Sequence, residues 1–132
     1  MIVVDASVVV DLLCNVGSSS ALHRRLTEEA LLAPDLLSVE VASALRGLNR
    51  GGVLTDGALE AAAVDLARLR VDVHPTLPLI PHMLALRRNV TAHDAAYVAL
   101  ASVFGCTLLT HDRRLARAAS GHCTVEVPVM SG

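Results

Sequence analysis

The stretch IVVDASVVVDLLC, residues 2–14, decides the fold class of this chain. It begins with an unbroken apolar run at 2–4, which is typical of a short strand buried on both faces. The run reaches Asp5, and the segment from Ala6 to Cys14 can continue as a helix. A strand that passes directly into a helix is the unit from which α/β folds are built.

The same alternation recurs along the chain. Short apolar runs predict further strands at 31–33, 71–74, 107–110 and 125–129, the last of them weak because Pro128 interrupts it. Helical spacing and capping residues predict helices at 6–14, 20–29, 35–50, 55–70, 79–88, 91–104 and 113–119. This order predicts a single domain, residues 1–132, with an α/β fold in which a mostly parallel sheet is flanked by helices.

The composition is that of a globular domain with an aliphatic core. Of the 132 residues, 53% are hydrophobic and 18% are charged, which excludes a disordered chain. Apolar stretches end before the roughly 18 residues needed to cross a bilayer, and the first residues lack the basic segment of a signal peptide. We therefore expect a soluble, cytoplasmic protein without membrane contact. Cys14, Cys106 and Cys123 lack CxxC spacing, so we expect reduced thiols with structural roles.

The charge pattern limits how the chain could bind nucleic acid. The net charge is -2, so any such binding must rest on a local patch rather than on the whole molecule. All 11 basic residues are Arg, and several stand in adjacent pairs, including those at 87–88 and 113–114. Guanidinium groups suit bidentate contact with phosphate, although codon bias in a GC-rich genome would explain the same preference.

Two acidic residues closely follow predicted strands. In an open α/β sheet, ligands bind beyond the carboxyl ends of the strands. Asp5 follows the first strand directly, and Asp112 follows the strand at 107–110 with one residue between. Each has an alternative role, because Asp5 can cap the helix at 6–14 and Asp112 can cap the helix at 113–119.

Two further acidic residues lie on predicted helices. Glu40 is at the edge of an apolar helix face, where a carboxylate needs a partner, and an ion pair with an Arg such as Arg46 is the alternative to a functional role. Asp94 stands in the first turn of an otherwise apolar helix. Its alternative role is a capping box, since the spacing Thr91-x-x-Asp94 fits that motif.

The combination of these four carboxylates predicts a metal-dependent hydrolase. Carboxylates gathered at one sheet edge would repel one another unless a cation bound them. Hard oxygen ligands without a clustered set of His or Cys favour Mg²⁺ or Mn²⁺ over Zn²⁺. Such a site suits cleavage of phosphodiester bonds, in which the metal polarises a phosphoryl oxygen and activates a water.

Four motifs give the chain a resemblance to a known family. In order and spacing they are similar to the PIN-domain pattern in the form typical of VapC toxins: DASV at 5–8, Ser38-Val39-Glu40, HDAAYVALA at 93–101 and LLTHDRRLA at 108–116. The resemblance spans essentially the whole chain, without a departure at the acidic positions. It implies a three-layer fold with about four or five mostly parallel strands. It also implies Mg²⁺, or Mn²⁺ in its place, held by the catalytic residues Asp5, Glu40, Asp94 and Asp112.

The resemblance further implies supporting residues and partners. Thr110 and Ser7 match hydroxyl positions that hydrogen-bond a metal ligand or its water. The family resemblance implies cleavage of RNA, with tRNA or rRNA as the expected substrate, a homodimer, and inhibition by a cognate VapB-like antitoxin. His93 and His111 stand at positions that vary in the family. We expect Asp11 to lie on a solvated helix face.

Two other functions remain open at this point. A PIN fold without catalysis would serve only as a binding module for another protein, although the intact acidic set argues against it. A phosphatase-like α/β hydrolase with an Asp nucleophile would begin with DxD, whereas Asp5 is followed by Ala6-Ser7. Metal-dependent RNA cleavage by the pure protein distinguishes a nuclease from a binding module.

Overall fold

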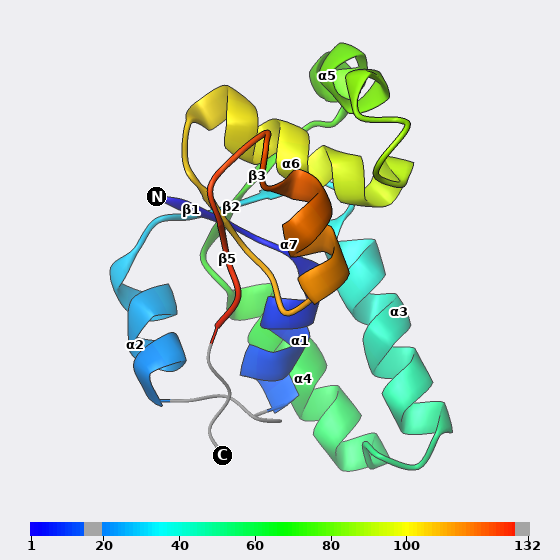
Figure 1. The fold of residues 1–132 in the computed structure, drawn as a ribbon. Helices are drawn as coiled ribbons and strands as arrows, with labels where there is room; N and C mark the ends of the chain where they lie inside the picture. Colours follow the sequence, from blue (N-terminus) through cyan, green and yellow to red (C-terminus); the bar gives the residue numbers. More distant parts are fainter. Residues whose placement is uncertain (15–19, 129–132) are drawn as a thin grey trace.

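A computed structural model describes residues 1–14 and 20–128, and these residues form the predicted α/β architecture (Figure 1). The strands are β1 Ile2–Val4, β2 Leu31–Pro34, β3 Val71–His74, β4 Thr107–Leu109 and β5 Val125–Glu126. The helices are α1 Ala6–Cys14, α2 Ser20–Glu28, α3 Leu37–Arg50, α4 Asp56–Arg68, α5 Ile80–Ala85, α6 Ala92–Phe104 and α7 Arg113–Ala119, and a short 3₁₀ helix, η1, spans Leu77–Leu79.

The sheet is parallel throughout and has the strand order β3-β2-β1-β4-β5, which confirms the predicted fold class. From β1 the chain moves outward through β2 to β3 and then returns to the other side of β1 for β4 and β5. The direction of winding therefore reverses between β1 and β4. In open α/β sheets, ligands bind at such a switch point, beyond the carboxyl ends of the strands. Asp5 and Asp112 follow these two strands.

Helices cover the sheet in two outer layers. Figure 1 shows α5 and α6 above the strands and α1 with α4 beneath them. Every residue of α6 from Ala95 to Ala101 is buried, as predicted for a helix that is apolar nearly all round. This helix ends at Gly105, whose φ of 63° lies in the left-handed region that glycine adopts without strain. No helix in the described part of the chain, α6 included, has the length and apolarity to span a membrane.

The segment between β3 and α6 differs from the prediction of one helix at 79–88. It forms η1, the short helix α5 and a series of turns. Pro78 stands at the start of η1 and Pro81 at the start of α5, because a residue without an N–H is tolerated only in the first turn of a helix. Several other boundaries also shift by a few residues. α3 begins at Leu37 rather than at residue 35, and β5 covers only part of the predicted 125–129, of which residue 129 lies outside the described residues.

Candidate active site

Asp5 lies at the carboxyl end of β1 and is only 7% exposed. Its Oδ1 accepts hydrogen bonds from the hydroxyl of Ser7 at 2.6 Å and from the backbone N–H of Val8 at 3.2 Å, and its Oδ2 accepts one from the hydroxyl of Thr110. The bond from Val8 is a helix cap for α1, so the capping role is present. A carboxylate has about four acceptor positions, which leaves room for a further ligand.

Burial raises the pKa of the Asp5 carboxyl group, although hydrogen bonds from Ser7, Thr110 and Val8 and the nearby His111 act in the opposite direction. The folded protein therefore holds the ionised form of Asp5 at a cost in free energy. A cation at this carboxylate would offset that cost.

The β4–α7 loop, residues 110–112, runs beside Asp5. β1 and β4 pair in a register that brings Thr110 next to Asp5. Thr110 is fully buried, and while its hydroxyl donates to Asp5, its Oγ1 accepts a hydrogen bond from the N–H of Asp112 at 3.0 Å. The hydroxyl of Thr110 thus links the main chain at Asp112 to the carboxylate of Asp5.

Asp112 caps α7, so the alternative role predicted for this residue is present. Its Oδ1 accepts hydrogen bonds from the backbone N–H of Arg114 at 3.0 Å and of Leu115 at 3.1 Å. Because both bonds use the same oxygen, the cap and a ligand on Oδ2 are compatible.

Glu40 lies in the first turn of α3, which follows β2 at the same edge of the sheet. The hydroxyl of Tyr97 in α6 donates a hydrogen bond to Oε1 of Glu40 at 2.5 Å. Within the described residues no ion pair joins Glu40 to Arg46, so that alternative is wrong. The partner that this half-buried carboxylate needs is the phenol of Tyr97.

Asp94 lies at the start of α6, which Thr91 caps. The hydroxyl of Thr91 accepts a hydrogen bond from the N–H of Asp94 at 3.2 Å. The reciprocal bond of a capping box, from the N–H of Thr91 to the Asp94 carboxylate, is absent from the described part of the chain. The Asp94 carboxylate is therefore not required to cap the helix.

Tyr97 is a residue of the site that sequence reasoning missed. It is 2% exposed, and burial is the largest cause that raises the pKa of its hydroxyl. The hydrogen bond to Glu40 and the charges of Glu40, Asp5 and Asp94 raise this pKa further. The charges of three of the predicted carboxylates, which lie directly after β1, in α3 and in α6, therefore raise the pKa of one hydroxyl. The available signal was that the chain's single Tyr stands one helical turn after Asp94 in an aliphatic helix.

Asp11 is the residue whose predicted environment is wrong. It was expected on a solvated face of α1, but it is 6% exposed, and its Oδ2 lies 2.8 Å from Nε2 of His111. Ser7 lies one helical turn before Asp11, so helical spacing places both residues on the same face of α1. That face is covered by a loop 100 residues further along the chain, which periodicity within the helix cannot indicate.

Comparison with known proteins identifies the family of this fold and site. Residues 2–121 match the PIN domain family. The chain belongs to the PIN-domain family. Ribonuclease VapC3 of Mycobacterium tuberculosis is 41% identical over 118 residues, which cover 89% of this chain and 86% of the relative. Ribonuclease VapC1 of the same organism is 40% identical over 127 residues, which cover 95% and 96% of the two chains. The resemblance drawn from the four motifs is confirmed.

A solved structure shares the fold of this PIN domain. A toxin-antitoxin complex from Klebsiella pneumoniae has a TM-score of 0.67 at 15% identity, and the match covers 99% of this chain and all of that one. At this identity the likeness concerns the fold alone.

The acidic residues of this PIN domain do not form a complete metal-binding group as they stand. In the ranges 1–14 and 20–128, no three Asp, Glu, His or Cys side chains lie close enough to hold an ion together. Tyr97 donates a hydrogen bond to Glu40, and the charges of Asp5 and Asp94 help to raise the pKa of its hydroxyl. Thr110 donates a hydrogen bond to Asp5 and accepts one from the N–H of Asp112.

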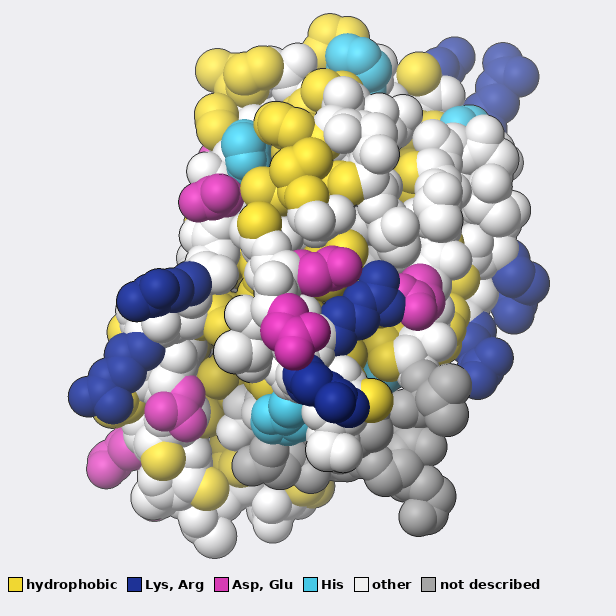
Figure 2. All heavy atoms as spheres, turned by 90° about the vertical axis from the view of Figure 1, so that its left-hand side faces the viewer, with side chains coloured by type: hydrophobic (Ala, Val, Ile, Leu, Met, Phe, Trp, Pro, Cys, Tyr) yellow, Lys and Arg dark blue, Asp and Glu magenta, His cyan; other side chains and the backbone are white. Residues whose placement is uncertain are grey.

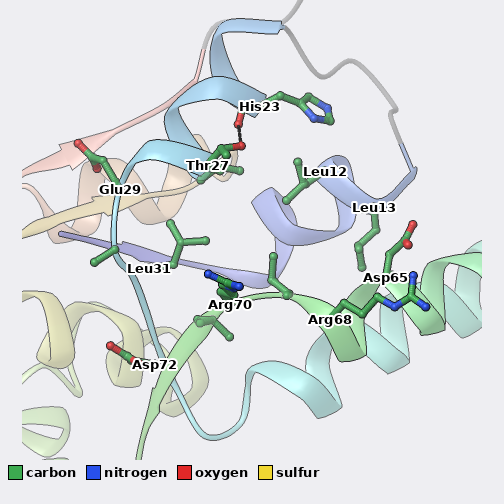
Figure 3. Close-up of a pocket in the computed structure, with 14 residues that line it drawn as sticks. Leu12, Leu13, His23, Thr27, Glu29, Leu31, Asp65, Arg68, Arg70 and Asp72 are labelled. Atoms are coloured by element: carbon green, nitrogen blue, oxygen red, sulfur yellow. Dashed lines mark hydrogen bonds between the residues drawn. The ribbon is translucent and has the colours of Figure 1, made fainter.

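A cavity of about 980 Å³ lies at the opposite edge of the sheet, between α2 and α4 and beside the first residues of β2 and β3. Figure 3 shows His23 and Thr27 on one side of it and Asp65 and Arg68 on the other. None of the predicted acidic residues lines this cavity, and its lining mixes acidic and basic groups. The cavity therefore indicates no particular chemistry, in contrast to the carboxyl edge of the sheet.

Proposed function

We propose that this PIN domain is a Mg²⁺-dependent endoribonuclease and the toxin of a toxin-antitoxin pair, acting on tRNA or rRNA in the cytoplasm. The observation that carries the proposal is the buried carboxylate of Asp5 at the switch point of the sheet, together with Glu40 of α3, whose carboxylate accepts a hydrogen bond from Tyr97 of α6. Relatives of 40% and 41% identity are named ribonucleases, which supports RNA as the substrate.

Asp5, Glu40, Asp94 and Asp112 are the proposed metal ligands and catalytic residues. Their hard oxygen donors fit Mg²⁺, or Mn²⁺ in its place. Burial raises the pKa of Asp5, so a cation would stabilise its carboxylate. When bound, the metal would polarise a phosphoryl oxygen and activate a water.

Neighbouring hydroxyl groups orient the proposed ligands. Ser7 and Thr110 donate to different oxygens of Asp5, which sets the orientation of its carboxylate, and Tyr97 does the same for Glu40. Hydrogen bonds of this kind to a ligand side chain typically change metal affinity or activity by about 10–100-fold. Binding strength at the site should therefore depend on these hydroxyls as well as on the carboxylates.

RNA contact is proposed to rest on the Arg pairs near the acidic residues. The pair at 87–88 is exposed in the turns that lead to Asp94, and the pair at 113–114 is exposed in the first turn after Asp112. Figure 2 shows that the face at the amino ends of the strands has Arg interleaved with Asp and Glu, rather than one basic patch. With a net charge of -2, phosphate binding requires such local groups.

A homodimer is proposed because apolar side chains are exposed around the edge strand β3. Val73, Leu77, Leu84, Val103 and Phe104 are 41–81% exposed, and the rings of His74 and Phe104 are 4.8 Å apart between centroids, which joins β3 to the end of α6. Figure 2 shows apolar side chains gathered in the upper half of its view. Exposed apolar groups that adjoin one another mark interaction surfaces.

Light scattering tests the dimer. The wild type should have twice the monomer mass of 13.8 kDa, and Leu77→Ser combined with Val103→Ser should shift it toward the monomer. A monomeric wild type would refute this part of the proposal.

A VapB-like antitoxin is proposed as the second partner, because the relatives are named VapC.

Hydrolysis of a labelled RNA tests the enzymatic proposal. EDTA should abolish cleavage, added Mg²⁺ should restore it, and Glu40→Gln should be inactive under both conditions. Glu60→Gln serves as the matched control, because Glu60 is an exposed carboxylate on α4. Full activity of exhaustively chelated protein would refute the metal dependence. Failure to cut any cellular RNA, together with tight antitoxin binding, would favour a catalytically silent binding module.

A further inference from the structure

Asp11 and His111 form a partly buried contact next to the proposed ligand set but outside it. Oδ2 of Asp11 and Nε2 of His111 are 2.8 Å apart, which is the distance of a hydrogen bond. The side chain of Asp11 is 6% exposed and that of His111 is 17% exposed. A carboxylate removed from water to this extent needs a polar partner, so the contact is part of how α1 and the β4–α7 loop fit together.

Two side chains of α1 hold the same loop residue. Ser7 precedes Asp11 by four residues, so both side chains lie on one face of the helix. Oγ of Ser7 accepts a hydrogen bond from the backbone N–H of His111 at 3.1 Å, and Asp11 contacts the ring of His111. Figure 1 shows the segment before α7 beside the start of α1. The main chain and the side chain of His111 are therefore both attached to α1.

The residues on either side of His111 belong to the proposed site. Thr110 donates to the carboxylate of Asp5, and Asp112 is tied to Thr110 through its N–H. A displacement of His111 would move both neighbours away from Asp5.

We propose that Asp11 is a positioning residue, which fixes the β4–α7 loop through His111 so that Thr110 and Asp112 keep their places beside Asp5. The effect on metal binding rests on the proposed function, whereas the effect on the loop does not. Val8 and Val9, with no more than 1% exposure, also attach α1 to the core.

Four variants separate positioning from general stability. Asp11→Ala and His111→Ala each remove one side of the contact. His111→Gln is the rescue variant, because the Gln amide places an N–H donor where Nε2 stood. His122→Ala is the matched control, since His122 is exposed after α7.

Two measurements are made on each protein. Electron paramagnetic resonance of Mn²⁺ gives the dissociation constant without RNA, and NMR hydrogen exchange of the amides of His111 and Asp112 is followed in EDTA. We expect both Ala variants to weaken Mn²⁺ binding by roughly 10–100-fold and to exchange these amides faster. His111→Gln and His122→Ala should stay close to the wild type.

Each outcome decides the inference. Exchange rates unchanged in both Ala variants would overturn it, whatever the metal does. Faster exchange with a Mn²⁺ dissociation constant within about twofold of the wild type would overturn the effect on the site. A wild type that binds no Mn²⁺ would refute the proposed metal site instead, and the exchange rates would still decide whether Asp11 fixes the loop.

Discussion

Replacing Asp5 with Asn tests the proposed site through stability alone. Burial raises the pKa of Asp5, so the folded protein holds the charged form less readily than the unfolded chain does. Asn removes the charge and keeps an oxygen that can accept the hydrogen bond from Val8, so the cap on α1 persists. We expect Asp5→Asn to melt at a higher temperature than the wild type in EDTA near neutral pH.

The pH dependence of this difference has a defined sign. Because the folded-state pKa of Asp5 is raised, the folded protein binds the proton more tightly than the unfolded chain. The resulting stabilisation is complete below the unfolded pKa, about 3.9, and is lost as the pH rises through the folded pKa. The advantage of Asp5→Asn in melting temperature should therefore be smallest at the acidic end and grow as the pH rises.

Mg²⁺ should stabilise the wild type and have little effect on Asp5→Asn. A ligand at about 100 times its dissociation constant adds about 2.7 kcal/mol to the free energy of unfolding. For a domain of 132 residues, 1 kcal/mol corresponds to roughly 3–5 °C, so the expected shift is on the order of 10 °C. Asn offers a neutral oxygen in place of a carboxylate, so Asp5→Asn should lose the stabilisation that Mg²⁺ gives the wild type.

Melting curves followed by circular dichroism, each with EDTA and with Mg²⁺, provide the measurement. Thr55→Ala is the control, because the hydroxyl of Thr55 caps α4 by accepting from the N–H of Ala58 at 3.1 Å. It should lose about 1 kcal/mol under both conditions and keep the Mg²⁺ shift. An Asp5→Asn variant that melts below the wild type in EDTA, with a wild type indifferent to Mg²⁺, would refute the reasoning.

Three further predictions concern activity and binding. Tyr97→Phe should fold but lose about tenfold or more in cleavage rate, because Glu40 loses its hydrogen-bond donor, and a wild-type rate in the RNA assay would contradict this. Asp94→Asn should remain soluble yet no longer arrest growth on expression, since Thr91 still caps α6, and undiminished toxicity would sink the catalytic role. RNA affinity should fall only shallowly with salt, and Ala at the Arg pairs should reduce the slope of log K against log salt by about 0.7 for each phosphate that Arg no longer neutralises. This quadruple variant replaces Arg87, Arg88, Arg113 and Arg114. An unchanged slope in it would place the RNA-binding residues elsewhere.

Features that depend on neighbours in the sequence could be predicted well. Short apolar runs marked the strands, and helical spacing marked α2 and α3, because strand and helix periodicity arise within a few residues. Capping followed from residue type, as at Asp112. The one helix predicted wrongly, at 79–88, contains Pro81, whose effect is also local, so this error was one of interpretation.

Only the tertiary structure decided the order of the strands and the partners of the site residues. The switch point between β1 and β4, the phenol of Tyr97 at Glu40 and the ring of His111 at Asp11 each join segments far apart in the chain. The sequence by itself determined which residues are chemically able to form these contacts, and the four motifs determined the family. Which of them meet depends on how helices pack on a sheet and on the requirement that buried polar groups find partners, and neither is encoded within one helix or strand.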